Sequence, residues 1–374
     1  MKILFVIPYP RFFSQIANMG GHVTHVIGVV QAMIELGHAV TILTEETSDL
    51  LEGIADDIVV VPCSASNPAG RLLWNRTFVK AAEQFRGKMD GAYVRYSVGF
   101  APFISRLKGA LGDCPLMLEV NSFLTQRKAF ARFFEGRMLS AADHILTVSQ
   151  RNRDQMVQYF GERVESKAFV VTNGVDLNRF EGWMDSNRRE WNVPIVLGYA
   201  GIIKDWYGLD SMIDGFQRLK ERMPNLCFRI YGDGPYRETL EAKYKDVDGL
   251  EFLGPQPFVN MPQVLSSIDV LINSATKQNA FQSPTKMFEY MASGRPIASA
   301  RTPQCEMLLK DGELGALYEL DDIESFVTVL SDVIADRDAA CQRARAARSE
   351  TESGHSWVAK CDSFMQVFMS GGQR

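Results

Sequence analysis

Short apolar runs alternate with helical patterns along the whole chain, and this alternation constrains the fold more than any other feature. The first run, residues 2–8 (KILFVIP), precedes a helical pattern at 22–37 (HVTHVIGVVQAMIELG), which leads into the next run at 38–44 (HAVTILT). Parallel strands that are buried on both faces appear as continuous apolar runs of this kind. The alternation therefore predicts βαβ units, that is, parallel sheets with helices on both faces.

The same rhythm occurs in both halves of the chain. Further strands are expected at 91–96, 115–121, 144–149, 195–201, 226–231, 250–255, 270–275, 295–300 and 315–320. At roughly 150 residues per domain, a chain of 374 residues is long enough for two domains. We predict an α/β protein with two Rossmann-like doubly wound domains, residues 1–176 and 195–355, joined by a polar linker at 177–194. A last helix at 356–374 is expected to pack back on the first domain.

The composition is that of an ordinary globular protein and argues against several classes. With 46% apolar and 23% charged residues and a net charge of -5, the chain has no basic excess of the kind that marks nucleic-acid-binding proteins. The 6 cysteines are scattered, so no zinc or redox motif is readable and a reducing compartment is expected. No apolar run approaches the ~20 residues of a membrane span. We expect a cytoplasmic protein.

Glycines follow two of the expected strands at points where a ligand would bind. In open parallel sheets, ligands bind beyond the carboxyl ends of the strands, and between two such domains the facing cleft is the expected site. Gly20 and Gly21 follow the first strand, and Gly232 and Gly234 follow the strand at 226–231. Glycine lets backbone N–H groups approach a bound anion closely. We therefore predict anion contacts at both glycine pairs.

Residues 281–296 (FQSPTKMFEYMASGRP) combine a helix start with charges that an ordinary buried helix would lack. Pro284 suits the first turn, where no N–H group is needed. Lys286 and Glu289 stand within the first two turns of an apolar pattern that ends at Gly294. A helix N-terminus attracts anions through its free N–H groups and its dipole. The residues alone leave open why a buried helix carries these charges at its start.

Taken in order, these motifs resemble the retaining GT-B glycosyltransferases of the GT4 type, glycosyl transferases group 1. The resemblance covers nearly the whole chain and is carried by residues 20–44, 142–149 (ADHILTVS), 170–180 (VVTNGVDLNRF), 231–235 (YGDGP) and 283–300. It implies a GT-B fold and transfer of a sugar from a nucleotide-diphosphate sugar, with UDP or GDP as the expected nucleotide. It implies no metal ion and no further cofactor.

The resemblance also gives roles to residues of the donor half. It implies that the helix begun at Ser283, Pro284 and Thr285 presents its free N–H groups to the donor diphosphate. It further implies that Lys286 adds a charge contact and that Glu289 binds the ribose hydroxyls. A charged hydrogen bond of the Glu289 type contributes roughly 1.5–3 kcal/mol. The structural alternatives are a solvated Lys286 and a Glu289 that makes only a surface ion pair.

Three positions depart from the donor pattern of the family. Phe281 stands where many members have a glutamate near the sugar hydroxyls. In the loop at 198–210 (GYAGIIKDWYGLD), Ile202 and Tyr207 replace an arginine and a lysine that contact diphosphate, so that Lys204 is the one cation left in this part of the sequence. We expect Lys204 to stabilise the leaving diphosphate; the alternative is a loop cation without a role.

Polar residues at strand ends of the first half are candidates for the acceptor side. Asn121 stands where many members place a histidine that contacts the donor sugar; an asparagine can donate to a sugar hydroxyl but cannot act as a general base. Glu119 ends the same strand, Arg95 ends the preceding one, and His25 follows Gly21 by about one turn. We assign all four polar residues to substrate binding; for His25 packing, and for Arg95 a structural ion pair, is the alternative.

The stretch at 124–139 (LTQRKAFARFFEGRML) mixes Arg127, Lys128, Arg132 and Arg137 with three phenylalanines and two leucines. Basic and aromatic residues at helical spacing suit a helix that lies on a membrane surface. In that case the protein is peripheral at the inner face of the cell membrane, and the acceptor is lipid-linked. An ordinary core helix with a solvated basic side is the alternative.

We expect a retaining glycosyltransferase of polysaccharide, glycolipid or glycoconjugate biosynthesis, with Asn121, Lys204, Lys286 and Glu289 as its catalytic residues. Phe281 keeps a second class open, a GT-B sugar-nucleotide epimerase or pseudo-glycoside synthase, and a non-catalytic nucleotide-binding homologue is a third. Conversion of the donor without an acceptor would identify the epimerase. Nucleotide affinity without turnover would identify the binding protein.

Overall fold

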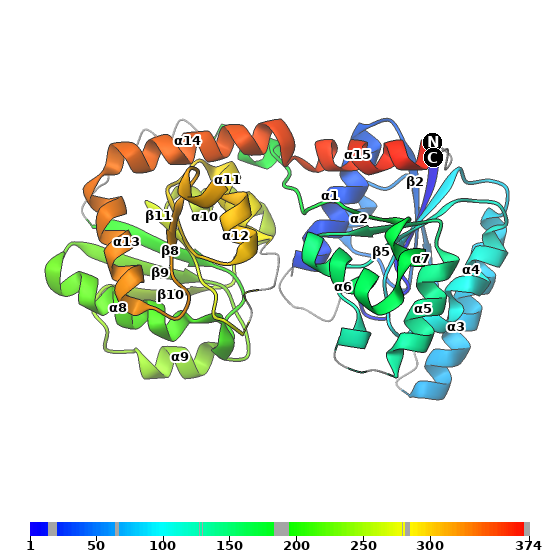
Figure 1. The fold of residues 1–374 in the computed structure, drawn as a ribbon, viewed down its shortest axis with the longest axis horizontal. Coiled ribbons are helices and arrows are strands. Elements are labelled where there is room, and N and C mark those ends of the chain that lie inside the picture. Colours follow the sequence, from blue (N-terminus) through cyan, green and yellow to red (C-terminus); the bar gives the residue numbers. More distant parts are fainter. Residues whose placement is uncertain are drawn as a thin grey trace. The chain divides into compact units, whose positions relative to one another are not determined.

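The chain forms two compact units (Figure 1). The computed structural model describes residues 1–13, 21–63, 67–126, 128, 130–182, 194–278, 280 and 285–369. The first unit holds the described residues up to Asn173, except Gly21, and those from Trp357 onward. The second unit holds Gly21 and the described residues from Gly174 to Ser356. The residues named above that lie outside the described ranges are Gly20, Arg127, Phe281, Ser283 and Pro284.

Among the described residues, the first unit forms a parallel sheet in the strand order β3-β2-β1-β4-β5-β6-β7. The strands are β1 Lys2–Val6, β2 Ala39–Thr44, β3 Asp57–Val60, β4 Gly91–Arg95, β5 Leu116–Glu119, β6 His144–Thr147 and β7 Ala168–Val170. Ile3 of β1 pairs with Val40 of β2 on one side and with Gly91 of β4 on the other. This central place buries β1 on both faces, which explains its unbroken apolar run.

Helices cover both faces of this first sheet (Figure 1). They are α1 Gly21–Glu35, α2 Asp49–Glu52, α3 Pro68–Ala82, η1 Glu83–Phe85, η2 Ala101–Phe103, α4 Ile104–Leu111, η3 Leu124–Gln126, α5 Ala131–Ala141, α6 Gln150–Phe160, α7 Glu162–Glu165 and α15 Trp357–Met369. On one face, Leu4 of β1 packs in a cluster with Phe78 of α3 and Leu107 of α4. On the other face, the ring of Tyr93 in β4 lies 5.5 Å from that of Phe364 in α15.

Gly28 allows α15 to lie close against α1. A Cβ atom at Gly28 would lie 2.1 Å from Nε1 of Trp357, so a larger residue would force the two helices apart. The Cys361 thiol of α15 lies 3.6 Å from the carbonyl oxygen of Val29 in α1. The last helix therefore packs on the first unit, although the chain reaches it from the second.

The second unit repeats the architecture, and its described strands lie parallel in the order β10-β9-β8-β11-β12-β13. They are β8 Ile195–Ala200, β9 Leu226–Tyr231, β10 Leu250–Gly254, β11 Val270–Asn273, β12 Ile297–Ala300 and β13 Ala316–Tyr318. Its helices are η4 Asn178–Phe180, η6 Asp205–Tyr207, α8 Leu209–Arg222, α9 Arg237–Lys243, η7 Phe258–Asn260, α10 Met261–Ser266, α11 Lys286–Ser293, α12 Pro303–Leu308, η8 Lys310–Gly312, α13 Ile323–Ala335 and α14 Arg337–Gly354.

The predicted fold class is confirmed: both units are α/β, with doubly wound parallel sheets. The 6 cysteines are free thiols. Several details differ from the sequence-based expectation, and among them are the strands β3 and β7, which the apolar runs did not indicate. The helical spacing expected across 124–139 begins only at Ala131, after the short turn η3. In the predicted linker, which overlaps the undescribed residues 183–193, Phe180 of η4 is buried in the second unit because its ring packs in an apolar cluster.

The strand order fixes where a ligand can approach each sheet. From β1 the chain adds strands toward one edge of the sheet and then, from β4 onward, toward the other edge. In the second unit this change of direction lies between β8 and β11. In open α/β sheets, ligands bind beyond the carboxyl ends of the strands at this reversal. In the second unit, the β8 loop and the start of α11 follow these two strand ends.

No helix among the described residues is long and apolar enough to cross a membrane.

Candidate active site

α11 is anchored at the carboxyl edge of the second sheet. Its residues Met287 and Met291 are fully buried. Gly294, with a φ of 65°, ends the helix in the left-handed conformation that glycine favours. The hydroxyl of Tyr290 accepts a hydrogen bond from the N–H of Ala200, at the end of β8, over 2.9 Å. These contacts fix the first turn of α11, and so Lys286 and Glu289, beside the β8 loop.

Lys286 points inward from the first turn of α11. Its Nζ lies 3.9 Å from the ring centroid of Tyr199 and close to Gly201, where a Cβ atom would lie 3.1 Å from it. In the part of the chain that the structure describes, no carboxylate forms an ion pair with Lys286. Burial lowers the pKa of Lys286 to about 7, and the nearby Cys305 thiol opposes this only in part. A bound anion would supply the missing counter-charge.

Glu289 lies one turn further along α11, and 23% of its side chain is exposed. Nη1 of Arg179 donates to its Oε1 over 3.1 Å. Nη2 of Arg179 donates to the carbonyl of Phe258, and the guanidinium carbon lies 3.4 Å from the ring centroid of Phe258. Burial raises the pKa of Glu289, and the charge of Arg179 opposes this rise. The sequence interpretation missed Arg179, although it stands in the NGVDLNRF motif beside the buried Phe180.

The loop after β8 brings a cation and two aromatic rings to the same edge. Nζ of Lys204 lies 5.3 Å from the ring centroid of Trp206 and 5.7 Å from that of Tyr207. Among the described residues, Lys204 has no carboxylate partner. Ile202, at the position of the family arginine, is 41% exposed. The charge of Lys204 is therefore available to a ligand. Thr285, another predicted donor-binding residue, stands directly before α11.

Gly232 and Gly234 have a structural reason to be glycine. A Cβ atom at Gly232, whose φ is 138°, would lie 1.8 Å from the carbonyl oxygen of Gly201, and one at Gly234 would lie 2.2 Å from that of Ile203. The N–H of Ile203 donates to the carbonyl of Asp233 over 2.9 Å. The two glycines thus let the loops after β8 and β9 touch backbone to backbone. Their predicted contact with an anion stays a prediction.

On the first unit, the four predicted acceptor-side residues form one network around Glu119, which is 1% exposed. Nη1 of Arg95 donates to both carboxylate oxygens of Glu119, over 2.9 and 3.1 Å. Nε2 of His25 and Nδ2 of Asn121 each lie 2.7 Å from Oε1. Burial alone would raise the pKa of Glu119, but Arg95 and His25 together lower it to about 2. The carboxylate is therefore held ionised inside the unit.

The network has a closed side and an open side. His25 is buried: its Nδ1 lies 2.9 Å from Oδ1 of Asn173, and its ring meets that of Trp357 edge to face at 4.8 Å. Asn121 is exposed at the end of β5, and Arg95 keeps 11% of its side chain exposed. Asn121 is therefore accessible to a ligand, whereas Glu119 and His25 are buried.

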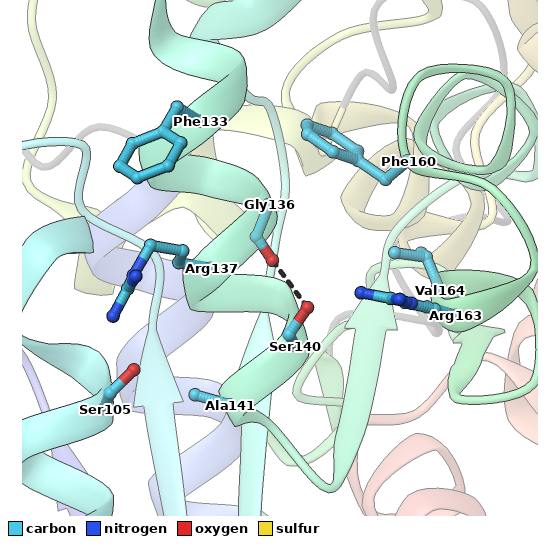
Figure 2. A pocket seen from close by; sticks show the side chains of 9 residues that line it. All are labelled: Ser105, Phe133, Gly136, Arg137, Ser140, Ala141, Phe160, Arg163 and Val164. Atoms are coloured by element: carbon cyan, nitrogen blue, oxygen red, sulfur yellow. Dashed lines mark hydrogen bonds between the residues drawn. The ribbon is translucent and has the colours of Figure 1, made fainter.

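A separate pocket of about 490 Å³ lies on the first unit between α4, α5, α6 and α7 (Figure 2). Its lining residues are Ser105, Phe133, Gly136, Arg137, Ser140, Ala141, Phe160, Arg163 and Val164. Among the described residues, neither Arg137 nor Arg163 has a carboxylate partner. The pocket therefore combines two arginines with aromatic rings, and of its lining residues Phe133, Gly136 and Arg137 belong to the segment 124–139. The described residues hold no group of three or more His, Cys, Asp or Glu side chains that could bind a metal ion.

Comparison with known protein families divides the chain as the structure does. Residues 19–179 match the sequence profile of Glycosyltransferase Family 4, and residues 194–336 match that of Glycosyl transferases group 1. The chain is a family 4 glycosyltransferase. It is therefore an enzyme of the transferase class.

The proteins that this chain resembles include a mannosyltransferase and a glycogen synthase. A phosphatidyl-myo-inositol mannosyltransferase of Mycobacterium tuberculosis is 21% identical over 359 residues, which are 93% of each chain. A glycogen synthase of the same species is 23% identical over 241 residues, 63% of this chain, and the match spans only 56% of that synthase. The crystal structure of Anabaena HepE with UDP and glucose has a TM-score of 0.77 at 17% identity and covers 99% of this chain and 100% of its own. This last likeness confirms the GT-B fold.

Proposed function

We propose that this glycosyltransferase transfers a sugar from a nucleotide-diphosphate sugar to an acceptor with retention of the anomeric configuration. The observation that carries the proposal is the pair Lys286 and Glu289 on one side of the first turns of α11, at the strand reversal of the second sheet. An uncompensated ammonium suits a diphosphate, and a partly exposed carboxylate suits a pair of ribose hydroxyls. Bound UDP in the Anabaena structure is in accord with this choice of ligand.

The proposed catalytic effect is electrostatic. When the bond between the sugar and the diphosphate breaks, negative charge grows on the leaving phosphate oxygen, and fixed positive groups stabilise it. Lys286, Lys204 and the free N–H groups at the start of α11 supply these groups. The acceptor hydroxyl attacks from the same face and gives its proton to the leaving phosphate, so no protein base is required. Asn121, which has no basic group, fits this scheme as a donor to a sugar hydroxyl.

Binding of nucleoside diphosphates tests the donor assignment. UDP, GDP, ADP and dTDP should be compared by thermal shift on the wild type and on Glu289→Ala. At about 100 times its dissociation constant, the correct nucleotide should stabilise the wild type by roughly 2.7 kcal/mol. We expect UDP or GDP to raise the melting temperature and Glu289→Ala to remove most of the rise. If none of the four shifts the wild type, the donor assignment is wrong.

For the acceptor, we propose a lipid-linked substrate reached at a membrane surface through α5. Phe130, Phe133 and Phe134 are 69%, 65% and 44% exposed on or beside this helix. The guanidinium of Arg137 lies 5.8 Å from the Phe133 ring centroid, at the pocket of Figure 2. Exposed aromatic rings insert among lipid headgroups, while basic residues gain about 1 kcal/mol each near an anionic surface.

Charge reversal checks this surface. The variant Lys128→Glu, Arg132→Glu, Arg137→Glu should lose binding to anionic vesicles by at least tenfold in co-sedimentation, because three attractive charges become repulsive.

A matched control reverses three exposed basic residues of the second unit, Arg222, Lys245 and Arg345, and should bind vesicles as the wild type does. Equal loss in both variants would show that total charge, not α5, governs binding. No loss in either would remove the membrane proposal.

A further inference from the structure

Arg179 is held in place by contacts other than its ion pair with Glu289. It comes from η4, directly before Phe180, whose buried ring anchors this turn in the second unit. Its Nη2 donates to the carbonyl of Phe258. Its guanidinium carbon lies over the Phe258 ring, 3.4 Å from the ring centroid. Stacking of this kind pre-orients the planar group. Arg179 therefore offers Nη1 to Glu289 from a fixed position.

The contact uses only part of the carboxylate. Nη1 of Arg179 meets Oε1 of Glu289 over 3.1 Å. Within the described residues, Arg179 is the one group that hydrogen-bonds to this carboxylate, and Oε2 has no donor. A carboxylate has about four acceptor positions on its two oxygens. Arg179 thus fixes the direction of the group and leaves acceptor positions for a ligand.

Charge gives the contact a second effect. Burial favours the neutral form of Glu289, and Arg179 is the group that opposes this preference. Other titratable groups near α11 are Lys286 and Tyr290 on the helix itself, and Tyr199 of β8 and Cys305 of α12 beside Lys286. From α14 and the residue after it come Arg348, which donates to the carbonyl of Ala292, and His355, whose ring lies 5.4 Å from that of Phe288. The adjoining helix α10 carries no titratable side chain.

We infer that Arg179 is a positioning residue for donor binding: it orients the Glu289 carboxylate and supplies its counter-charge, so that Glu289 can accept hydrogen bonds from the two ribose hydroxyls. This inference rests on the proposed function, which places a nucleotide at Glu289. Arg179 lies outside the motif at 283–300. It comes from the segment in which the chain enters the second unit, shortly after Gly174.

The test is the pH dependence of nucleotide binding in Arg179→Met. Dissociation constants for UDP and GDP are measured by calorimetry from pH 5.5 to 8.5 in the wild type and the variant. Both carry Lys286, so its titration cancels in the ratio of the two constants. We expect the variant to bind tenfold or more weakly at pH 5.5 and to keep only a smaller loss at pH 8.5. Without Arg179, burial favours the protonated form of Glu289 at acidic pH, whereas the loss of its orientation persists at every pH.

Three further variants separate positioning from a general structural effect. Arg179→Lys keeps the charge and should show a flat ratio across pH. Adding Arg179→Met to Glu289→Gln should cause no pH-dependent loss, because no carboxylate remains to titrate. Arg229→Met, which removes the arginine of another pair with a glutamate in this unit, should bind as the wild type does.

The outcomes are distinct. A ratio that stays constant with pH overturns the inference while leaving the donor assignment intact. Failure of UDP and GDP to bind the wild type overturns the proposed function and the inference together. If Arg179→Met does not fold, Arg179→Gln, which keeps a donor for the Phe258 carbonyl, takes its place with the same expected ratio.

Discussion

Replacing Lys286 by methionine is expected to lower kcat for sugar transfer by roughly 10²- to 10³-fold, the usual cost of removing one preorganised group that stabilises charge in the transition state. Lys286 is held against Tyr199 and has no carboxylate partner among the described residues, so its charge is available to the leaving diphosphate. The rate is measured as release of nucleoside diphosphate. Lys243→Met, at a surface lysine paired with Asp210, is the matched control and should keep full activity.

The same substitution should stabilise the ligand-free enzyme at low pH. The pKa of Lys286 falls from an ordinary 10.5 to about 7 on folding. Below pH 7 the lysine is charged in both states, and the cost of burying that charge is fully present; the cost fades as pH rises from 7 to 10.5. Lys286→Met should therefore raise the melting temperature clearly at pH 6 and less at pH 9. A variant with wild-type activity and an unchanged melting temperature would contradict the role given to Lys286.

Replacing Glu119 by alanine is expected to destabilise the first unit by about 3–5 kcal/mol, because removing one partner of a buried ion pair leaves the other uncompensated. Arg95 would lose both of its carboxylate contacts, and His25 would lose the oxygen that faces its Nε2. Urea unfolding followed by circular dichroism measures the change. Glu251→Ala, which breaks a half-exposed pair with Arg229, should cost at most about 1 kcal/mol.

The pH dependence of the Glu119 effect has a defined sign. The folded-state pKa of about 2 lies below the ordinary 4.5, so the stabilisation is fully present above pH 4.5 and is lost as pH falls through 2. The difference between wild type and Glu119→Ala should be constant from pH 5 to 8 and shrink below pH 4. A loss below 1 kcal/mol at pH 7 would show that the network around Glu119 is not a unit of stability.

Much of the fold was predictable because local pattern and global architecture agree. Apolar runs such as residues 2–8 are continuous since the central strands are buried on both faces, and Gly294 ends α11 in the conformation that its lack of a side chain permits. Lys286 and Glu289 were found because charge within an otherwise apolar helix violates the pattern. Local signals did not indicate the strands β3 and β7, and the GT-B fold was expected from the family resemblance.

What escaped prediction depends on contacts between segments distant in sequence. Arg179 reaches Glu289 across 110 residues, and no local feature distinguishes it from a solvated arginine. For the glycines at 232 and 234 the anion contact stays a prediction, but the sequence did not show that the backbone of the β8 loop lies against both. His25 lies about one turn after Gly21 in sequence, yet its surroundings come from β5, Asn173 and α15. Such pairings become visible only when the tertiary structure is known.

The most direct test of the account counts the protons taken up when the donor nucleotide binds. Calorimetric titration of UDP and GDP at pH 8, in two buffers of different ionisation enthalpy, yields this number. In the ligand-free enzyme the pKa of Lys286 is about 7, so at pH 8 the side chain is mostly a neutral amine, and a bound diphosphate should restore its charge. We predict uptake of close to one proton by the wild type and of none by Lys286→Met. Equal proton counts in the two proteins would show that the diphosphate does not bind at Lys286.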